Sequence, residues 1–241
     1  MTAEFLLLIA IFLIAMLYSS VGHGGASGYL ALLAMSGAGI MEMRSTALLL
    51  NICVSAIAFA HFLSNGHFSW RRFWPFAAGS IPFSFIGAGL DTSPFLYRKL
   101  LAICLVFAVG RILFTINAGS SKRVPSPPLA ILIGAAIGLL SGTIGIGGGI
   151  ILGPILLIAG WSTAHQAAAI CSLFILVNSM SGIVGLPGAD HFTGVGIPWV
   201  ISAIAGGTIG SFIGARRIPD LRLRQVLGSV LLIASLKLFI A

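Results

Sequence analysis

The alternation of apolar and polar positions divides the chain into long hydrophobic segments separated by short polar gaps. Most of these segments have the length and uniform apolarity of membrane-embedded helices, and none shows the strict alternation of a half-buried strand. The pattern therefore predicts an all-α polytopic membrane protein. The ten predicted segments lie at residues 4–20, 27–40, 46–63, 74–90, 95–116, 128–141, 149–160, 165–186, 197–214 and 223–240.

Composition supports a membrane location and excludes a soluble domain. Hydrophobic residues make up 58% of the 241 positions, and charged residues make up only 7%, whereas a soluble domain carries roughly 25% charged residues. The net charge of +8 comes from Lys and Arg that fall mainly in the polar gaps, as the positive-inside rule expects. We therefore predict a multi-pass protein of the cell (inner) membrane, with the lipid bilayer and not nucleic acid as its partner. The pattern predicts no oligomeric state.

Two glycine clusters interrupt the apolar sequence, one at residues 22–25 and one at residues 145–149. Each opens a segment, 27–40 or 149–160, that is too short for an ordinary membrane span. Irregular backbone at membrane depth is tolerated only where it is buried in protein or lines a cavity. A helix that starts there presents free N–H groups, which suit an anion. The alternative is that these glycines serve helix packing alone.

The two clusters belong to an internal repeat. Residues 1–116 form a predicted first membrane repeat, 117–127 a cytoplasmic linker, and 128–241 a second repeat. The glycine clusters match at an offset of 123 residues, and Phe85–Ala88 matches Phe212–Ala215 at an offset of 127. Basic residues change loop between the halves, with Arg71 and Arg72 in the first half against 216–224 in the second. This charge bias predicts inverted repeats whose short, glycine-broken helices or re-entrant hairpins meet near the bilayer midplane.

The predicted substrate site combines the glycine backbone with polar side chains of the segments that follow. Asn51 and Ser172 are predicted to contact the substrate, with hydrogen bonding between helices as the alternative. His23 has three open interpretations: it binds the anion, carries a proton as coupling ion, or fills the loop. The predicted site residues are Gly22, His23, Gly24, Gly25, Asn51, Gly145, Gly147, Gly148, Gly149 and Ser172.

The remaining polar residues predict no catalytic site, no metal site and no cofactor. No nucleophile–base pair or ligand cluster stands out, and no Asp or Glu lies in the middle of a segment, which disfavours an enzyme and a cation pump. Glu42 and Arg44, at a segment edge, are expected to form an interfacial pair. A secondary transporter of a small anion, working by alternating access, explains these features. A channel-like permease for another small anion and a non-transporting scaffold are the alternatives.

One stretch carries a family resemblance. Ser141–Gly149 reads Ser-Gly-Thr-Ile-Gly-Ile-Gly-Gly-Gly and is followed by Pro154 and by a polar segment that ends near Asn178. With the two-fold repeat, these residues resemble the sulfite exporter TauE/SafE family of membrane permeases. The resemblance implies transport of sulfite, thiosulfate, sulfoacetate or a related organosulfonate, with Asn51 and Ser172 as polar lining. The chain departs from the family at His23 and Ala26, where glycine is common, and at Ala31, where proline is frequent.

Overall fold

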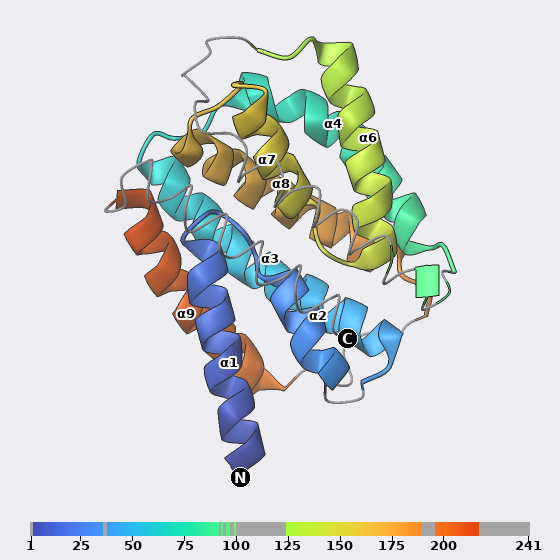
Figure 1. Cartoon of the computed structure of the whole chain (residues 1–241), viewed down its shortest axis with the longest axis vertical. Coiled ribbons are helices and arrows are strands. Elements are labelled where there is room, and N and C mark those ends of the chain that lie inside the picture. The colour runs from blue at the N-terminus through green and yellow to red at the C-terminus, as the bar shows by residue number, and fades with distance from the viewer. Residues whose placement is uncertain are drawn as a thin grey trace.

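The computed structural model describes residues 2–35, 38–91, 124–188 and 196–216, with a few single positions between 93 and 99. These residues form helices joined by short loops, and no strand occurs among them (Figure 1). Most of the predicted segment 95–116, the whole of 223–240 and most of the linker lie outside this part of the chain. The helices are α1 (Thr2–Ser19), α2 (Ala26–Met35), α3 (Ile40–Ser64), α4 (Trp70–Ala88), α6 (Pro127–Ile144), α7 (Gly149–Ile158), α8 (Ala164–Gly185) and α9 (Ile197–Arg216).

Helix lengths confirm the predicted all-α membrane protein. Among the described helices, α3, α6, α8 and α9 are long and apolar enough to cross a bilayer. In contrast, α2 and α7 have ten residues each and reach only about 15 Å, half of a hydrocarbon core of roughly 30 Å. The two helices that follow the glycine clusters are therefore short, as the sequence predicted.

Helices α3 and α8 lie side by side at the centre of the molecule (Figure 1). They run in opposite directions, because Asn51 of α3 contacts Ser179 of α8, whereas Phe62, further along α3, packs against Ala168 near the start of α8. This antiparallel pair joins the first half of the chain to the second, and it carries the polar residues that the sequence singled out.

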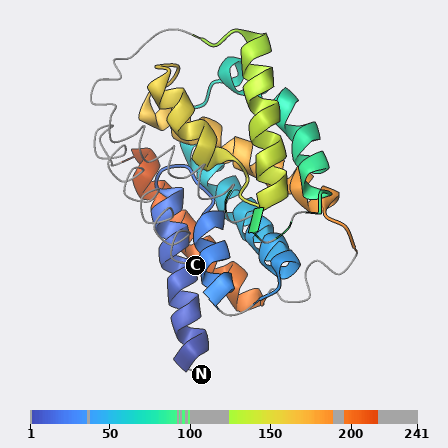
Figure 2. The ribbon, with the colours of Figure 1, turned by 45° about the vertical axis from the view of Figure 1, so that its right-hand side comes forward.

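Two further pairs flank the centre, α1 with α9 on one side and α4 with α6 on the other (Figures 1 and 2). Small residues allow close backbone contact in both pairs. In each pair, later residues of one helix contact later residues of the other, so the two helices are parallel. Along α9, Gly206, Gly210 and Gly214 face the carbonyls of Phe12, Met16 and Ser20, and along α6, Gly134, Gly138 and Gly142 face those of Phe76, Ser80 and Ser84.

The main contacts between helices have equivalent contacts between the corresponding helices of the other half. Helix α3 packs on α9 as α8 packs on α4, and α2 packs on α3 as α7 packs on α8. The contacts of α4 with α8 are parallel, from Arg72–Gln166 to Ser84–Asn178. Those of α3 with α9 are also parallel. Since α3 and α8 are antiparallel, α1, α3 and α9 run in one direction and α4, α6 and α8 in the other, so each helix of the first half runs opposite to its counterpart in the second.

The start of α3 corrects an expectation from the sequence. The predicted segment began at residue 46, and Arg44 was expected at the interface with Glu42. Instead α3 begins at Ile40, and Arg44 is buried, with its Nη2 donating to the carbonyls of Ala88 (3.0 Å) and Gly142 (2.9 Å). The cation lies where α4 and α6 end, and it binds carbonyls that have no partner within their own helices.

Candidate functional site

The first glycine loop joins α1 to α2 and is completely buried. The His23 N–H donates to the Tyr18 carbonyl (2.9 Å), which turns the chain back at the end of α1. The Gly25 carbonyl then accepts from the N–H groups of Gly28 (2.9 Å) and Tyr29 (3.0 Å) and so starts α2. Gly25 has a φ of +100°, a conformation that residues with a side chain rarely adopt.

The second glycine loop repeats this arrangement between α6 and α7. The Ile146 N–H donates to the Ser141 carbonyl (3.3 Å), and the Gly148 carbonyl accepts from Ile151 and Leu152 (both 3.1 Å). Gly148 has a φ of +77° and is the N-cap of α7. The five backbone groups of each loop correspond at an offset of 123 residues, and this loop is buried as well. The predicted glycine clusters thus form two loops of the same construction.

Asn51 connects the two loops. Its Oδ1 accepts from the N–H of Ala26 (3.0 Å), the first residue of α2. Its Nδ2 donates to the Ile146 carbonyl (3.4 Å) of the second loop and lies 3.5 Å from Ser179 Oγ of α8. Asn51 has no exposed surface. One side chain of the first half therefore binds the backbone of both glycine loops.

The glycines beside Asn51 are required by this close approach. A Cβ at Gly24 would overlap Asn51 Oδ1, and a Cβ at Gly147 would lie 3.0 Å from Asn51 Nδ2 and 2.8 Å from the Ile175 side chain. Any side chain at Gly24 or Gly147 would displace the amide. The structure brings Gly24, Asn51 and Gly147 together, three of the residues that the sequence predicted for the site.

His23 reaches from the first loop to α7. A Cβ at Gly153, in the first turns of α7, would lie 3.5 Å from His23 Cε1 and 3.6 Å from Nε2. The Nδ1 of the ring contacts the Val21 carbonyl at 3.0 Å, and the ring is only 1% exposed. The first loop therefore touches the short helix that the second loop begins.

The outer glycine of each loop packs against the central helix of the other half. Gly22 lies against the backbone of Ala168 in α8, and Gly145 lies against Arg44 in α3, whose Cγ would be 3.3 Å from a Cβ at Gly145. The two contacts occupy corresponding places, but only the second brings a positive charge to a loop. Sequence reasoning missed Arg44 as a site residue. The signal was present, since an arginine inside a long apolar helix usually has a specific partner.

The remaining predicted residues lie around this centre without a polar contact to it. Gly148 packs against Ile137 and Phe174, Gly25 against Tyr29, and Gly149 against Ile175. Ser172 is buried, but its hydroxyl donates to the Ala169 carbonyl (2.9 Å) of its own helix. Its predicted role in substrate contact therefore has no counterpart in the hydrogen bonds of the described structure.

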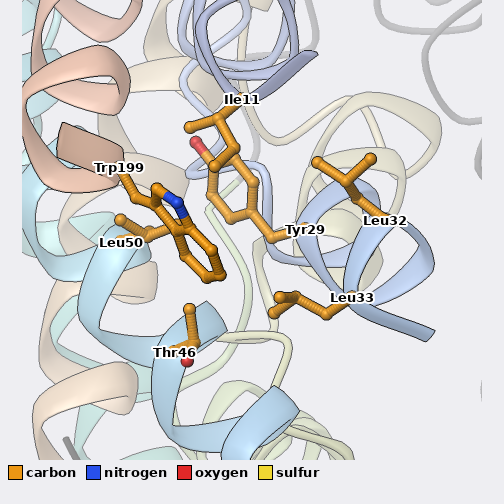
Figure 3. Close-up of a pocket in the computed structure, with 7 residues that line it drawn as sticks. All are labelled: Ile11, Tyr29, Leu32, Leu33, Thr46, Leu50 and Trp199. Carbon is orange, nitrogen blue, oxygen red and sulfur yellow. The ribbon is translucent and has the colours of Figure 1, made fainter. Parts of the chain in front are cut away.

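A narrow apolar pocket lies beside the first loop, between α1, α2, α3 and α9. It is too small for a water molecule. The Tyr29 ring forms one wall and also packs against Gly25 (Figure 3). The residues that line the pocket are Ile11, Tyr29, Leu32, Leu33, Thr46, Leu50 and Trp199. None of the predicted glycines faces this pocket, so it is not the centre at Asn51.

The electrostatics at the centre favour a negative ligand. Helices α2 and α7 both begin there, and the N-terminus of each carries free N–H groups and a partial positive charge. Arg44 adds a full positive charge beside the second loop. In the described part of the chain, no three His, Cys, Asp or Glu residues cluster as metal ligands would.

These features define a polytopic membrane protein in which two short helices begin at one buried centre, an arrangement found in transporters. The chain belongs to the sulfite exporter TauE/SafE family, whose sequence model matches residues 7–238. It is 39% identical over 238 residues to the probable membrane transporter protein y4hK of Sinorhizobium fredii (strain NBRC 101917 / NGR234), with 96% of each chain covered. No solved structure matches the chain. The protein is thus a multi-pass membrane transporter.

Proposed function

We propose that the protein is a secondary transporter that moves a small sulfur-containing anion by alternating access. The observation that carries this proposal is the position of Asn51, whose amide binds the backbone of both glycine loops. A ligand that entered between the loops would meet this amide, the N-termini of α2 and α7, and the charge of Arg44. Sulfite, thiosulfate, sulfoacetate and related organosulfonates present several anionic oxygens to such donors.

The substrate class rests on the family name, and transport is favoured over catalysis because the family consists of transporters. We propose no enzymatic activity and no cofactor. Ser172 is retained in this proposal as a side chain that turns toward the substrate only when α8 moves.

Two inverted repeats underlie the proposed mechanism, one within residues 1–116 and one within 128–241. The opposite directions of corresponding helices, α1 and α6, α3 and α8, and α4 and α9, support this proposal. The matching hydrogen bonds of the two loops support it too. In transporters built this way, the halves rock around a site near the midplane and expose it to one side at a time.

The closed state of the centre favours alternating access over a permanently open channel. Both loops are buried, and the apolar pocket beside the first loop does not admit water. An anion can reach Asn51 only after helices around the centre separate. A channel-like permease would need a continuous polar path, and a scaffold would need no anion at all.

The proposal is tested by ligand-induced thermal stabilisation of the protein purified in detergent. The panel is sulfite, thiosulfate, sulfoacetate, taurine, sulfate, formate and chloride. An anion that binds only the folded state at a hundred times its Kd adds about 2.7 kcal/mol to the free energy of unfolding. We expect this stabilisation from one or more of the sulfur anions and expect Asn51→Ala to remove it.

Asn178→Ala is the matched control. Asn178 is equally buried, but its Nδ2 donates to the Phe174 carbonyl (2.8 Å) within α8, so its loss leaves both loops intact. We expect Asn178→Ala to lower the melting temperature without abolishing the response to the anion. If no sulfur anion stabilises the wild-type protein, or if chloride does so equally well, the proposed substrate class is wrong.

A further inference from the structure

The second ring nitrogen of His23, Nε2, lies buried in the protein interior. It makes no hydrogen bond of good geometry, the ring is 1% exposed, and its further polar contact is with the Gly149 backbone. Such a group is costly to bury.

The partner of Nδ1 fixes where the ring proton lies. A carbonyl oxygen only accepts, so the 3.0 Å contact with the Val21 carbonyl places a hydrogen on Nδ1. In the neutral ring, Nε2 then carries a lone pair and no hydrogen. The ring can gain a proton at Nε2 while it keeps its bond to Val21, and no rearrangement of the loop is needed.

The surroundings of Nε2 couple this proton to an anion. The ring lies against the first turns of α7, whose N-terminus carries a partial positive charge. A second positive charge on Nε2 is unfavourable there until an anion occupies the helix N-terminus. An opposite charge at about 4–6 Å changes a proton affinity by roughly tenfold to a thousandfold, and linkage requires the proton to strengthen anion binding by the same factor.

We propose that His23 carries one proton with each anion, so that the transporter is a proton–anion symporter. This inference rests on the proposed function, since it requires an anion at the start of α7. On loading, the Nε2 lone pair takes a proton from the aqueous side that is open, and the anion binds beside it. On release to the other side, the proton leaves Nε2 and the anion leaves the helix, so that the empty site returns with a neutral ring.

Among the described residues, the other titratable side chains around this position are a thiol and two phenols. They are Cys171 of α8, whose Sγ would lie 3.4 Å from a Cβ at Gly153, Tyr29 of α2, whose hydroxyl would lie 2.9 Å from a Cβ at Gly25, and Tyr18 of α1. The Tyr18 hydroxyl is already hydrogen-bonded to Ser27 Oγ (2.9 Å). Helix α7 itself contains no ionisable residue, and Arg44 lies beside Gly145 of the other loop.

The test uses the full chain in proteoliposomes with radiolabelled thiosulfate, which stays ionised through the neutral range and brings no proton of its own. Counterflow measures exchange of thiosulfate without a gradient, and uptake driven by an acidic exterior measures coupling. A pH-sensitive dye in the lumen reports the protons. We expect wild-type protein to acidify the lumen in step with uptake, at about one proton per thiosulfate.

His23→Asn removes the titratable nitrogen, while the Asn amide can still donate to Val21. We expect thiosulfate counterflow to persist with a weaker apparent affinity and without dependence on pH, whereas uptake driven by the pH gradient falls by about tenfold or more. His23→Gln provides a second non-titrating side chain. The wild-type proton measurement needs no variant, and it tests the symport even if both variants fold poorly.

The outcomes separate this inference from the proposed function. Absence of thiosulfate counterflow in wild-type protein overturns the proposed function and this inference with it. Counterflow without proton movement in wild-type protein overturns the symport alone. Proton movement that persists undiminished in a folded His23→Asn variant also overturns it, because another group then carries the proton.

Discussion

At the residue scale, a buried arginine holds together helix ends that lie far apart in the sequence. Arg44 donates to the Ala88 carbonyl at the end of α4 and to the Gly142 carbonyl near the end of α6. Its stem also packs against Gly145 of the second loop. The guanidinium is favourable at these helix C-termini because the carbonyls there carry a partial negative charge. Arg44 therefore positions the second loop in addition to contributing charge.

We predict that Arg44→Met lowers the free energy of unfolding by on the order of 3 kcal/mol, because two buried carbonyls lose charged donors. Arg44→Lys should recover part of this loss, since the ammonium keeps the positive charge but lies on a shorter side chain than Nη2. SDS-induced unfolding in mixed micelles measures both variants. Arg71 is exposed, and Arg71→Met is the control, expected within about 0.5 kcal/mol of wild type. Equal stability of Arg44→Met and Arg71→Met would contradict this account.

The sequence predicted the individual glycines of the site better than their side-chain partners. Positive φ angles at Gly25 and Gly148 follow from glycine clusters at the start of short helices, and Asn51 was recognisable as a polar residue in an apolar segment. The partners of Arg44 lie 44 and 98 residues away. Contacts over such separations depend on how the helices pack against one another. No local pattern in the amino-acid sequence reveals them.

At the scale of helices, apolar segment lengths predicted most of the elements but misjudged some of their ends. Helix α3 starts at Ile40 and α4 at Trp70, earlier than the predicted residues 46 and 74. In both cases charged residues near the start were assigned to a gap. Arg44 and Arg72 instead lie within helices, where they bond to Ala88 and Gln166. Tertiary hydrogen bonds here outweigh the local preference of charged residues for the aqueous phase.

Glycine has different functions in different helices, which a pair of substitutions can separate. A Cβ at Gly138 of α6 would overlap the Ser80 backbone of α4, whereas a Cβ at Gly182 of α8 would lie 3.4 Å from the Leu48 side chain, an ordinary contact. Alanine is favoured over glycine within a helix by about 1 kcal/mol. We predict that Gly138→Ala destabilises the protein, because α4 and α6 must separate, and that Gly182→Ala is neutral or stabilising.

Melting temperatures of the two alanine variants in the same detergent check this prediction. A chemical cross-link between cysteines placed on the facing surfaces of α4 and α6 provides a second readout, since it should form more slowly in Gly138→Ala. If both variants melt at the wild-type temperature, close packing of α4 against α6 is not what Gly138 provides.

At the scale of the whole molecule, inverted repeats place corresponding loops on opposite sides of the membrane. Ser64 is exposed and is the last residue of α3, and Pro187 is exposed and lies just after α8. We predict that Ser64→Cys and Pro187→Cys, each in a chain whose three native cysteines are replaced by alanine, react from opposite sides. The positive-inside rule assigns Ser64 to the cytoplasm, next to Arg71 and Arg72.

A membrane-impermeant maleimide applied to intact cells measures the two sides. Pro187→Cys should react directly, and Ser64→Cys only after the membrane is permeabilised. Labelling of both cysteines from the same side would rule out inverted repeats, whatever the absolute orientation.

The lateral pairs of helices also determine the order in which the protein can be assembled during synthesis. Helix α1 enters the membrane first, but its parallel partner α9 begins at Ile197, so α1 must wait in lipid until nearly the whole chain has been made. Helix α4 likewise completes its packing only when α6 of the second half arrives. Each pair, α1 with α9 and α4 with α6, contains one helix from each half, so neither half can complete its folding alone. A ribosome that stops early would leave a fragment whose small-residue faces are open to the bilayer, where they can pair with the wrong neighbour.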